Sequence, residues 1–323
     1  MKSRSVKRSM DEVVARNIVS SNATTPKAKA GRRSKYSRDT IIFDSLITLL
    51  LIGVLIAVLV PLWYVIVVSL TPLSANQIQG YNLFLPPNQW SLEAYVQLLS
   101  QDTFLSALFN SCIITGFGVA TNMILTTLTA YGLTIKGLPG RNIFLSLILF
   151  TFLFNAGLIP TYLLVKDLNL LNTFAAVILP GAISVYNLFV MKTFFQSLPT
   201  TLREAAIVDG ANELQVLWHV VLPLSKPIML TIGMFYAVGQ WNEFFLPILY
   251  LNDTNLMPLP VLLRNILSGA SMSDYVGQNA LSSTPQDALK MAAVILTMLP
   301  MLALYPWIQR HFTKGILLGS VKE

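Results

Sequence analysis

Charged side chains are scarce in this sequence of 323 residues. Asp, Glu, Lys and Arg make up 11% of it, whereas soluble domains carry about 25%. Hydrophobic residues make up 54%, and the mean hydropathy is +0.62. The shortage of charge excludes an ordinary soluble domain and places the chain in the class of membrane proteins.

Cysteine and histidine are also rare. The single cysteine, Cys112, excludes an intrachain disulfide, and neither His219 nor His311 has a second His, Cys or carboxylate at metal-ligand spacing. The sequence contains no Gly-x-x-x-x-Gly-Lys-Ser/Thr loop, so the chain itself does not bind ATP in the P-loop manner. Clustered His, Asp or Ser groups are missing too. We therefore expect no metal site, no cofactor in this chain and no catalytic residues.

Positive charge is concentrated at one end. Eleven of the 22 Lys and Arg residues lie within residues 1–40, in a stretch rich in Ser, Thr and Asn. We predict that 1–40 is a basic, disordered cytoplasmic extension that fixes the topology of the chain. Binding of nucleic acid or anionic lipid is the alternative, although we expect no nucleic-acid partner. No apolar core occurs within these residues, so no signal peptide is predicted.

Long apolar runs are abundant after residue 40. About 20 apolar helical residues cross the hydrocarbon core of a bilayer. Six stretches reach this length, at 41–70, 105–134, 142–165, 171–195, 227–251 and 288–309. The predicted fold class is therefore an all-α membrane protein with six transmembrane helices.

The distribution of Lys and Arg sets the orientation of these spans. With the N-terminus in the cytoplasm, nineteen Lys and Arg residues lie inside and three lie outside. Because cytoplasmic segments carry the excess of Lys and Arg, both termini are predicted to be cytoplasmic. Residues 197–227 are then the longest internal cytoplasmic segment, while 71–104 and 252–287 are long outer segments that we expect to be folded.

The internal cytoplasmic segment is polar and is predicted to form two short helices separated by a bend. Thr201 and Glu204 fit a capping box, in which the Thr hydroxyl accepts from the backbone three residues on. Gly210 is placed to leave the first helix in a left-handed conformation. Asn212, with Gln215 three residues on, is placed to cap the second helix. A structured loop between two spans indicates a docking surface for a soluble partner.

The same segment carries a family motif. Glu204-Ala205-Ala206, then Gly210, then Val220-Val221-Leu222-Pro223 after nine residues resembles the signature loop of inner-membrane permeases of binding-protein-dependent ABC importers. The resemblance covers residues 41–323. Further features resemble the carbohydrate-uptake branch, namely Leu85-Pro86-Pro87, Ser91-Leu92-Glu93-Ala94-Tyr95, Asn110-Ser111, Trp241-Asn242 and Pro258-Leu259-Pro260. Within this branch the chain is similar to the maltose permease G-type subunits and to the LplC/YtcP-type permeases linked to complex polysaccharide uptake.

The resemblance implies a type I ABC importer permease fold, with an ABC permease transmembrane domain at 41–323, in the cytoplasmic (inner) membrane of a bacterium. It implies import of di- or oligosaccharides, fragments of acidic polysaccharides included, by alternating access. The implied partners are a second homologous permease, two ATP-binding subunits and an extracytoplasmic solute-binding protein. ATP and Mg would be held by the ATP-binding subunits, and the chain itself is expected to be no enzyme.

In this family the cytoplasmic loop forms a coupling helix seated in a cleft of the ATP-binding subunit. Seven positions would make, shape or support that contact here: Leu202, Glu204, Ala205, Ala206, Asp209, Gly210 and Val216. Small alanines permit close approach, and rigid helices transmit closure of the ATPase to the spans. The alternative is an amphipathic helix that lies on the membrane surface.

Polar and aromatic side chains inside the spans are candidate sugar contacts, because such groups are costly in a bilayer unless they face a cavity. The fifth span has the densest group, and the third and fourth add weaker candidates. The nine residues are Tyr236, Gln240, Trp241, Asn242, Glu243, Asn155, Tyr162, Tyr186 and Asn187. Interhelical hydrogen bonds and packing are the alternative role for them.

The second long outer segment is a candidate contact for the binding protein. In maltose-type permeases the equivalent loop reaches into that protein and helps to dislodge sugar. The resemblance implies this role for Asn252, Asp253, Thr254, Asn255, Leu256 and Met257.

Two other transport functions remain open from the residues. The loop motif alone permits a permease for another solute, such as an amino acid or phosphate, and only the branch features argue against it. An ion-coupled carrier needs buried carboxylates or broken half-helices near mid-membrane, for which Glu243 is thin support. Because the fifth span holds this acid and no Lys or Arg, it does not favour an anionic ligand unless a partner permease supplies positive charge.

Overall fold

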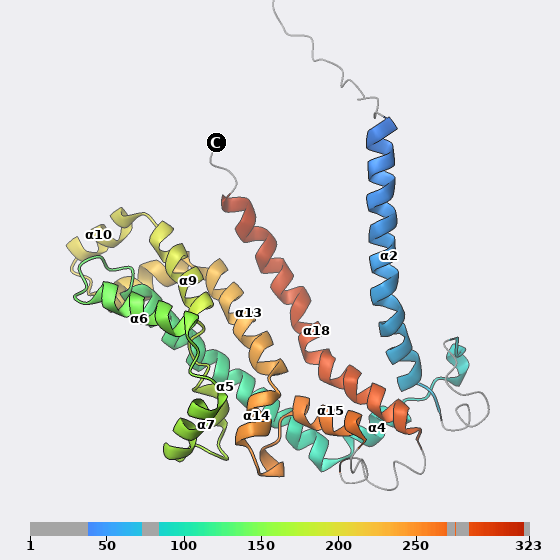
Figure 1. Cartoon of the computed structure of the whole chain (residues 1–323). Helices are drawn as coiled ribbons and strands as arrows, with labels where there is room; N and C mark the ends of the chain where they lie inside the picture. Colours follow the sequence, from blue (N-terminus) through green and yellow to red (C-terminus); the bar gives the residue numbers. More distant parts are fainter. Residues whose placement is uncertain (1–37, 73–83, 270–274, 276–283, 320–323) are drawn as a thin grey trace, which may run out of the picture. The chain divides into compact units, whose positions relative to one another are not determined.

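The computed structural model describes residues 38–72, 84–269, 275 and 284–319 (Figure 1). Every regular element in these residues is a helix, which confirms the predicted all-α class. The predicted basic extension lies outside the described residues as far as residue 37. The chain divides into two units, residues 1–59 and 60–323.

Four helices are long. They are α2 (Arg38–Ser69), α5 (Asp102–Gly132), α13 (Lys226–Asn242) and α18 (Gln286–Gly319). Between α5 and α13 lie α6 (Arg141–Leu153), α7 (Leu158–Asp167), α8 (Phe174–Ile178), α9 (Val185–Ser197), α10 (Thr200–Val208), α11 (Glu213–Val216), the π-helix η2 (Leu217–Val221) and α12 (Leu222–Leu224). The shorter elements elsewhere are η1 (Pro87–Gln89), α4 (Glu93–Leu99), α14 (Phe245–Tyr250), η3 (Thr254–Leu256) and α15 (Leu259–Ser268).

Three of these helices are long and apolar enough to cross a bilayer, at Ile42–Ser69, Asp102–Gly132 and Gln286–Leu304. Two bent pairs raise the number to five if each pair forms one span, namely α6 with α7 and Glu213–Leu224 with α13. The described residues thus support three to five spans by length and composition. The count of six and the cytoplasmic position of both termini stay predictions.

The third and fourth predicted spans are not continuous helices. α6 and α7 meet at an angle of 118°, and Gly157 between them has a φ of +87°, a conformation that suits glycine. Pro160 follows in the first turn of α7, where a missing N–H leaves no helical bond unmade. The fourth stretch is divided into α8 and α9 by residues 179–184, among which Pro180 cannot donate to the helical ladder.

The second unit is built around α5, which packs against α13, α9, α8 and α15. One buried apolar cluster joins α4, α5, α15 and α18 and includes Leu98, Phe104 and Leu262. Another joins α5, α9, η2 and α13 and includes Leu188 and Ile232. Helix α5 therefore links the apolar cluster beside the α10–α11 segment with the cluster that contains α15 (Figure 1).

Candidate functional site

The α10–α11 segment folds as two short helices joined by a tight turn. Gly210 in the turn has a φ of +88°, which confirms the predicted left-handed conformation. Asn212 Oδ1 accepts from the backbone N–H of Gln215 at 2.9 Å, and Gln215 Oε1 accepts from that of Asn212 at 2.8 Å. The sequence predicted this capping box at Asn212. The second predicted capping box, at Thr201, is not formed, so that prediction is wrong. Pro199 occupies the N-cap of α10 without a side-chain hydrogen bond, so Thr201 already lies inside the helix.

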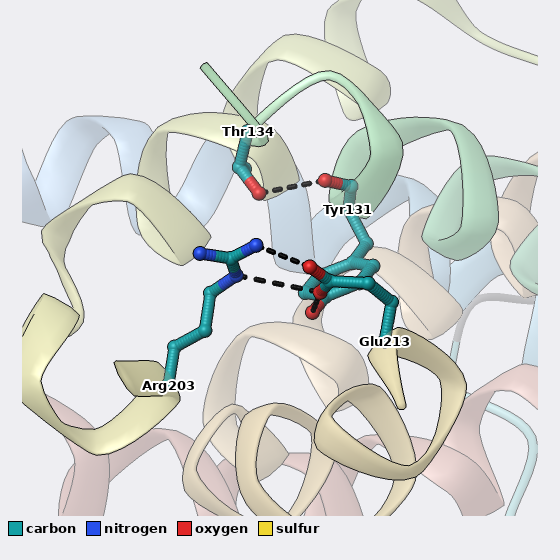
Figure 2. Close-up of polar contacts among 4 residues, drawn as sticks. All are labelled: Tyr131, Thr134, Arg203 and Glu213. Atoms are coloured by element: carbon teal, nitrogen blue, oxygen red, sulfur yellow. Dashed lines mark hydrogen bonds and ion pairs between the residues drawn. The ribbon is translucent and has the colours of Figure 1, made fainter. Parts of the chain in front are cut away.

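A cluster of polar side chains joins α10 to α11 and attaches α11 to α5 (Figure 2). Arg203 on α10 forms an ion pair with Glu213 on α11, in which Nη2 donates to Oε1 and Nε donates to Oε2 at 3.3 Å. The Tyr131 hydroxyl, near the end of α5, donates to the same Oε2 at 2.6 Å. Thr134 Oγ1 in turn donates to the carbonyl of Tyr131 at 2.6 Å. One carboxylate thus joins three elements.

The cluster sets the ionisation of its two charged members. Burial acts to raise the pKa of the Glu213 carboxyl, but hydrogen bonds from Arg203 and Tyr131 and the charge of Arg203 hold this pKa below 4.5, its ordinary value. The hydrogen bond to Glu213 raises the pKa of the Arg203 guanidinium. The pair therefore stabilises the fold above the ordinary pKa of glutamate, and the contribution is lost as the pH falls through the lowered pKa. Solvent screens it, because the two side chains are 37% and 41% exposed.

The seven predicted coupling positions divide by exposure. Five are exposed, at Leu202, Glu204, Ala205, Asp209 and Gly210. Ala206 is half-buried and Val216 is fully buried, and both pack in the apolar cluster with α5, α9 and α13. Val216 therefore holds the segment against the spans and does not itself face a partner.

The segment also presents exposed apolar side chains that the sequence motif does not contain. Val208, Leu214 and Trp218 are 86%, 61% and 64% exposed. Exposed apolar surface is typical of docking sites, so each of these side chains is a candidate contact for a partner. Their apolar character in an otherwise polar segment was a signal in the sequence, but these positions are not part of the family motif.

An open cavity of about 270 Å³ lies where α5, α8, α9 and α13 meet. Its polar lining consists of Asn122, Ser184, Asn187, Tyr236, Gln240 and Glu243. Four of these residues were among the nine predicted sugar contacts. Asn122 and Ser184 were missed, although an amide such as Asn122 within an apolar span is a recognised signal for a cavity or an interhelical contact.

One wall of the cavity is an amide pair between α5 and α13. With its amide group oriented to satisfy both of its polar atoms, Asn122 donates to the carbonyls of Gly118 at 3.0 Å and Ala182 at 3.3 Å. Its oxygen accepts from Gln240 Nε2 at 3.2 Å. Asn122 is only 1% exposed, so these bonds satisfy a polar group that would otherwise be costly to bury.

Tyr236 and Glu243 contribute to the cavity wall while making structural hydrogen bonds. The Tyr236 hydroxyl accepts from the backbone N–H of Ser184 at 3.0 Å and shares a 2.6 Å hydrogen bond with Thr126 Oγ1. Glu243 Oε1 accepts from the first two backbone N–H groups of α14, at 3.0 and 3.1 Å. Tyr236 thus ties the gap between α8 and α9 to α5, and Glu243 caps α14.

Trp241 and Asn242 lie on a different face of α13 from Gln240. They line a second, mainly apolar cavity of about 440 Å³ among α13, α15 and α18. Trp241 is buried, and its Nε1 donates to the carbonyl of Thr297 on α18 at 3.1 Å. The predicted single cluster on this span is therefore divided, because adjacent residues of a helix point in different directions.

The remaining predicted contacts also lie away from the 270 Å³ cavity. Asn155 Oδ1 accepts from the backbone N–H of Gly157 at 2.9 Å, within the break between α6 and α7. Tyr162 stacks on Tyr250 with ring centroids 6.1 Å apart. Tyr186 is 60% exposed on α9. The structure brings none of these three side chains to the cavity lining.

Two asparagine amides hold residues 252–257, the predicted binding-protein contact. Asn172 Oδ1 accepts from the first two backbone N–H groups of this stretch, at 2.6 and 3.3 Å. Asn110 Nδ2 on α5 donates to two carbonyls in its second half, at 2.7 and 3.1 Å. Asp253 Oδ1 accepts from both the backbone and the side chain of Asn255. The stretch is therefore fixed at both ends and within.

The residues described here contain no group of three His, Cys, Asp or Glu side chains that could hold a metal ion. Their chemistry is that of hydrogen bonding at a cavity and of contact at an exposed segment. Apolar helices broken around a polar cavity, with a structured segment at one end, define a membrane transport subunit.

Comparison with known proteins identifies the family. Residues 94–317 match the model of the binding-protein-dependent transport system inner membrane component. Protein LplC of Bacillus subtilis (strain 168) is 40% identical over 302 residues, which cover 93% of this chain and 98% of LplC. The polygalacturonan/rhamnogalacturonan transport system permease protein YtcP of the same organism is 43% identical over 284 residues, which cover 87% of this chain and 98% of YtcP.

A solved structure of an ABC transporter is also similar to this chain. The crystal structure of a bacterial ABC transporter involved in the import of the acidic polysaccharide alginate contains a chain that is 31% identical, with a TM-score of 0.81. The match covers 86% of this chain and 99% of that one. This chain belongs to the family of binding-protein-dependent transport system inner membrane components. It has the type I permease fold and is a non-catalytic, multi-pass subunit of an ABC transport system, which also includes an ATPase and a solute-binding protein.

Proposed function

We propose that the chain is the permease subunit of an ATP-driven importer of di- or oligosaccharides. The observation that carries this proposal is the 270 Å³ cavity, whose polar lining offers amides, hydroxyl groups and a carboxylate. Amides and hydroxyls both donate and accept hydrogen bonds, as sugar hydroxyls require. The names of YtcP and of the alginate transporter support carbohydrate as the solute class.

Fragments of acidic polysaccharides are included in the proposed solutes, with a condition on charge. Glu243 brings a carboxylate to the cavity lining, which includes no Lys or Arg. Two negative charges repel each other strongly at low dielectric. The cavity therefore suits the hydroxyl groups of a sugar, and a uronate carboxylate would be directed toward positive charge on the partner permease.

The proposed assembly contains a second homologous permease, two ATP-binding subunits that hold ATP and Mg, and an extracytoplasmic solute-binding protein. This chain would contribute six spans with both termini in the cytoplasm, and no cofactor of its own. The excess of Lys and Arg in the predicted cytoplasmic segments supports the orientation. In that orientation the α10–α11 segment lies on the cytoplasmic side and residues 252–257 on the outer side.

We propose that the α10–α11 segment docks on an ATP-binding subunit. Support comes from the exposed small and charged positions Glu204 and Ala205 and from the exposed apolar side chains Val208 and Trp218. Residues 252–257 are proposed to contact the binding protein, because a stretch held by side chains on both flanks loses little conformational entropy when it binds.

The test is the ATPase activity of the reconstituted complex with its binding protein, measured against neutral and uronate-containing oligosaccharides. Stimulation by at least one of the two classes is expected, and the class that stimulates reports whether the ligand is charged. If no glycan stimulates a complex that assembles and hydrolyses ATP, the carbohydrate assignment is wrong and the importer carries another solute.

A further inference from the structure

The carboxylate of Glu213 is a meeting point of three elements. It belongs to α11, pairs with Arg203 on α10, and accepts the hydroxyl proton of Tyr131 on α5 (Figure 2). Arg203 lies ten residues from Glu213, across the Gly210 turn, and Tyr131 lies 82 residues away. The ion pair therefore holds α10 and α11 together as one unit, and the hydrogen bond from Tyr131 attaches this unit to α5.

Apolar packing beside the carboxylate holds the segment close to α5. Val216 at the end of α11 and Leu217 at the start of η2 follow Glu213 in the sequence and are 0% and 1% exposed. They belong to one buried cluster with Ala130 and Tyr131 of α5. Hydrophobic contact is non-directional, so this packing keeps the segment close to α5, while the hydrogen bond from Tyr131 fixes the orientation of the segment on the helix.

Helix α5 also connects this attachment with the cavity. Thr126 lies five residues before Tyr131, which is about 7.5 Å along a helix. Its hydroxyl is hydrogen-bonded to Tyr236 at 2.6 Å, and Tyr236 accepts from the backbone N–H of Ser184 at the cavity wall. Every connection between Glu213 and the cavity is thus a hydrogen bond or a stretch of continuous helix.

We propose that Glu213 and Tyr131 form a latch that makes α5 follow the α10–α11 segment, so that Tyr131 is a positioning residue for transport. The proposal rests on the proposed docking of this segment on an ATP-binding subunit. A hydroxyl group that donates to a carboxylate forms a strong, charge-assisted hydrogen bond. Loss of the Tyr131 hydroxyl leaves the Arg203–Glu213 pair and the apolar packing in place. The segment should then still receive the ATP-binding subunit but no longer move α5 fully.

The first experiment needs no knowledge of the solute. Cys112 is the only cysteine of the chain and is exposed on α5, 19 residues or about 28 Å of helix from Tyr131. An environment-sensitive fluorophore is attached to Cys112 in the complete complex, with partner subunits free of reactive cysteine, and MgATP is added. We expect a fluorescence change in the unsubstituted complex and a change at least about fivefold smaller in Tyr131→Phe, the lower range of coupling between sites.

Tyr95→Phe is the matched control. Tyr95 also loses a hydrogen-bonded hydroxyl, one that is 2.7 Å from Ser69 Oγ and far in sequence from the latch. Its fluorescence response should equal that of the unsubstituted complex. No response without any substitution, or an equal response in Tyr131→Phe with MgATP still bound, would overturn the latch.

A double-substitution cycle tests whether the two residues act together. Glu213→Ala removes the acceptor, so adding Tyr131→Phe to it should reduce the response no further, whereas independent residues would show additive losses. In proteoliposomes, Tyr131→Phe should lower oligosaccharide uptake per ATP hydrolysed by about fivefold or more. A merely structural role would lower uptake and hydrolysis together and leave their ratio unchanged. If the unsubstituted complex imports no glycan, the proposed solute class is wrong. The fluorescence experiment does not involve the solute, so its result still shows whether the latch exists.

Discussion

Gln240 on α13 lies directly against Gly118 on α5. A methyl group at position 118 would be 2.9 Å from Gln240 Cδ, inside the closest approach of ordinary carbon atoms. The amide of Gln240 donates to Asn122, one helical turn further along α5. The missing side chain of Gly118 therefore allows α13 to approach α5 and fixes an amide in the cavity wall.

Gly118→Ala is expected to displace the Gln240 side chain and weaken sugar transport. Forcing one methyl group into a packed contact costs about 1–3 kcal/mol, offset in part because Ala is favoured over Gly within a helix by about 1 kcal/mol. We predict a raised KM for uptake with normal assembly. Gly116→Ala is the control, since a methyl group there meets nothing within 4 Å. Equal KM values for the two variants would contradict this role of Gly118.

Glu243→Gln should change the preference for charge without unfolding the site. A glutamine oxygen can still accept from the two N–H groups that Glu243 caps at 3.0 and 3.1 Å, while the negative charge is removed. Uptake of uronate-containing oligosaccharides should therefore rise relative to neutral ones. Glu243→Ala, which also removes the cap, should lose about 1 kcal/mol of stability. An unchanged ratio of charged to neutral uptake in Glu243→Gln would show that this carboxylate does not face the solute.

Local structure around the glycine turn could be predicted from the sequence because its causes are local. Gly210 needs a left-handed conformation, and Asn212 and Gln215 cap each other across three residues. The error at Thr201 has a local cause too, since Pro199 takes the cap position and starts the helix earlier. Such rules act over one turn of chain and are visible in a single sequence.

Non-local relationships were not predictable in this way. The Tyr131–Glu213 bond joins residues 82 positions apart, and no period or motif relates them. Composition identified the membrane class, but the breaks at Gly157 and Pro180 lie within apolar stretches that read as continuous spans. Consecutive polar and aromatic residues in the fifth span suggested one sugar-binding site. The helical geometry instead places Trp241 in a different cavity from Gln240.

Trp241→Ala should therefore reduce the amount of folded complex and leave substrate preference unchanged. The substitution removes a buried ring and the hydrogen bond from Nε1 to Thr297, and truncation of a buried Trp costs about 3–5 kcal/mol. Thermal stability of the purified complex and uptake ratios for a sugar panel measure the two effects separately. A shifted sugar preference at normal stability would contradict this prediction and show that Trp241 contacts the solute.

Gly210→Ala should destabilise the turn between α10 and α11. The added methyl group meets open space, so the cost comes only from the φ of +88° and amounts to about 1–2 kcal/mol. Gly210→Asn should cost less, because Asn adopts the left-handed conformation more readily. Gly137→Ala is the control, with equally open space and no positive φ. We predict weaker association with the ATP-binding subunit in Gly210→Ala alone, measured by co-purification; equal association in both Ala variants would refute it.

Asn110→Ala should weaken the affinity of the binding protein for the complex without affecting ATP binding. The amide of Asn110 supports two carbonyls of residues 252–257, at 2.7 and 3.1 Å, and its loss leaves both without this donor. A stretch freed at one end must be ordered when it binds, which costs affinity. Removing hydrogen bonds of this kind costs about 0.5–1.5 kcal/mol each, so the Kd should rise by about fivefold or more. Asn142→Ala, which removes an exposed amide on α6, should leave the Kd unchanged. Equal Kd values for both variants would show that the order of this stretch does not contribute to docking.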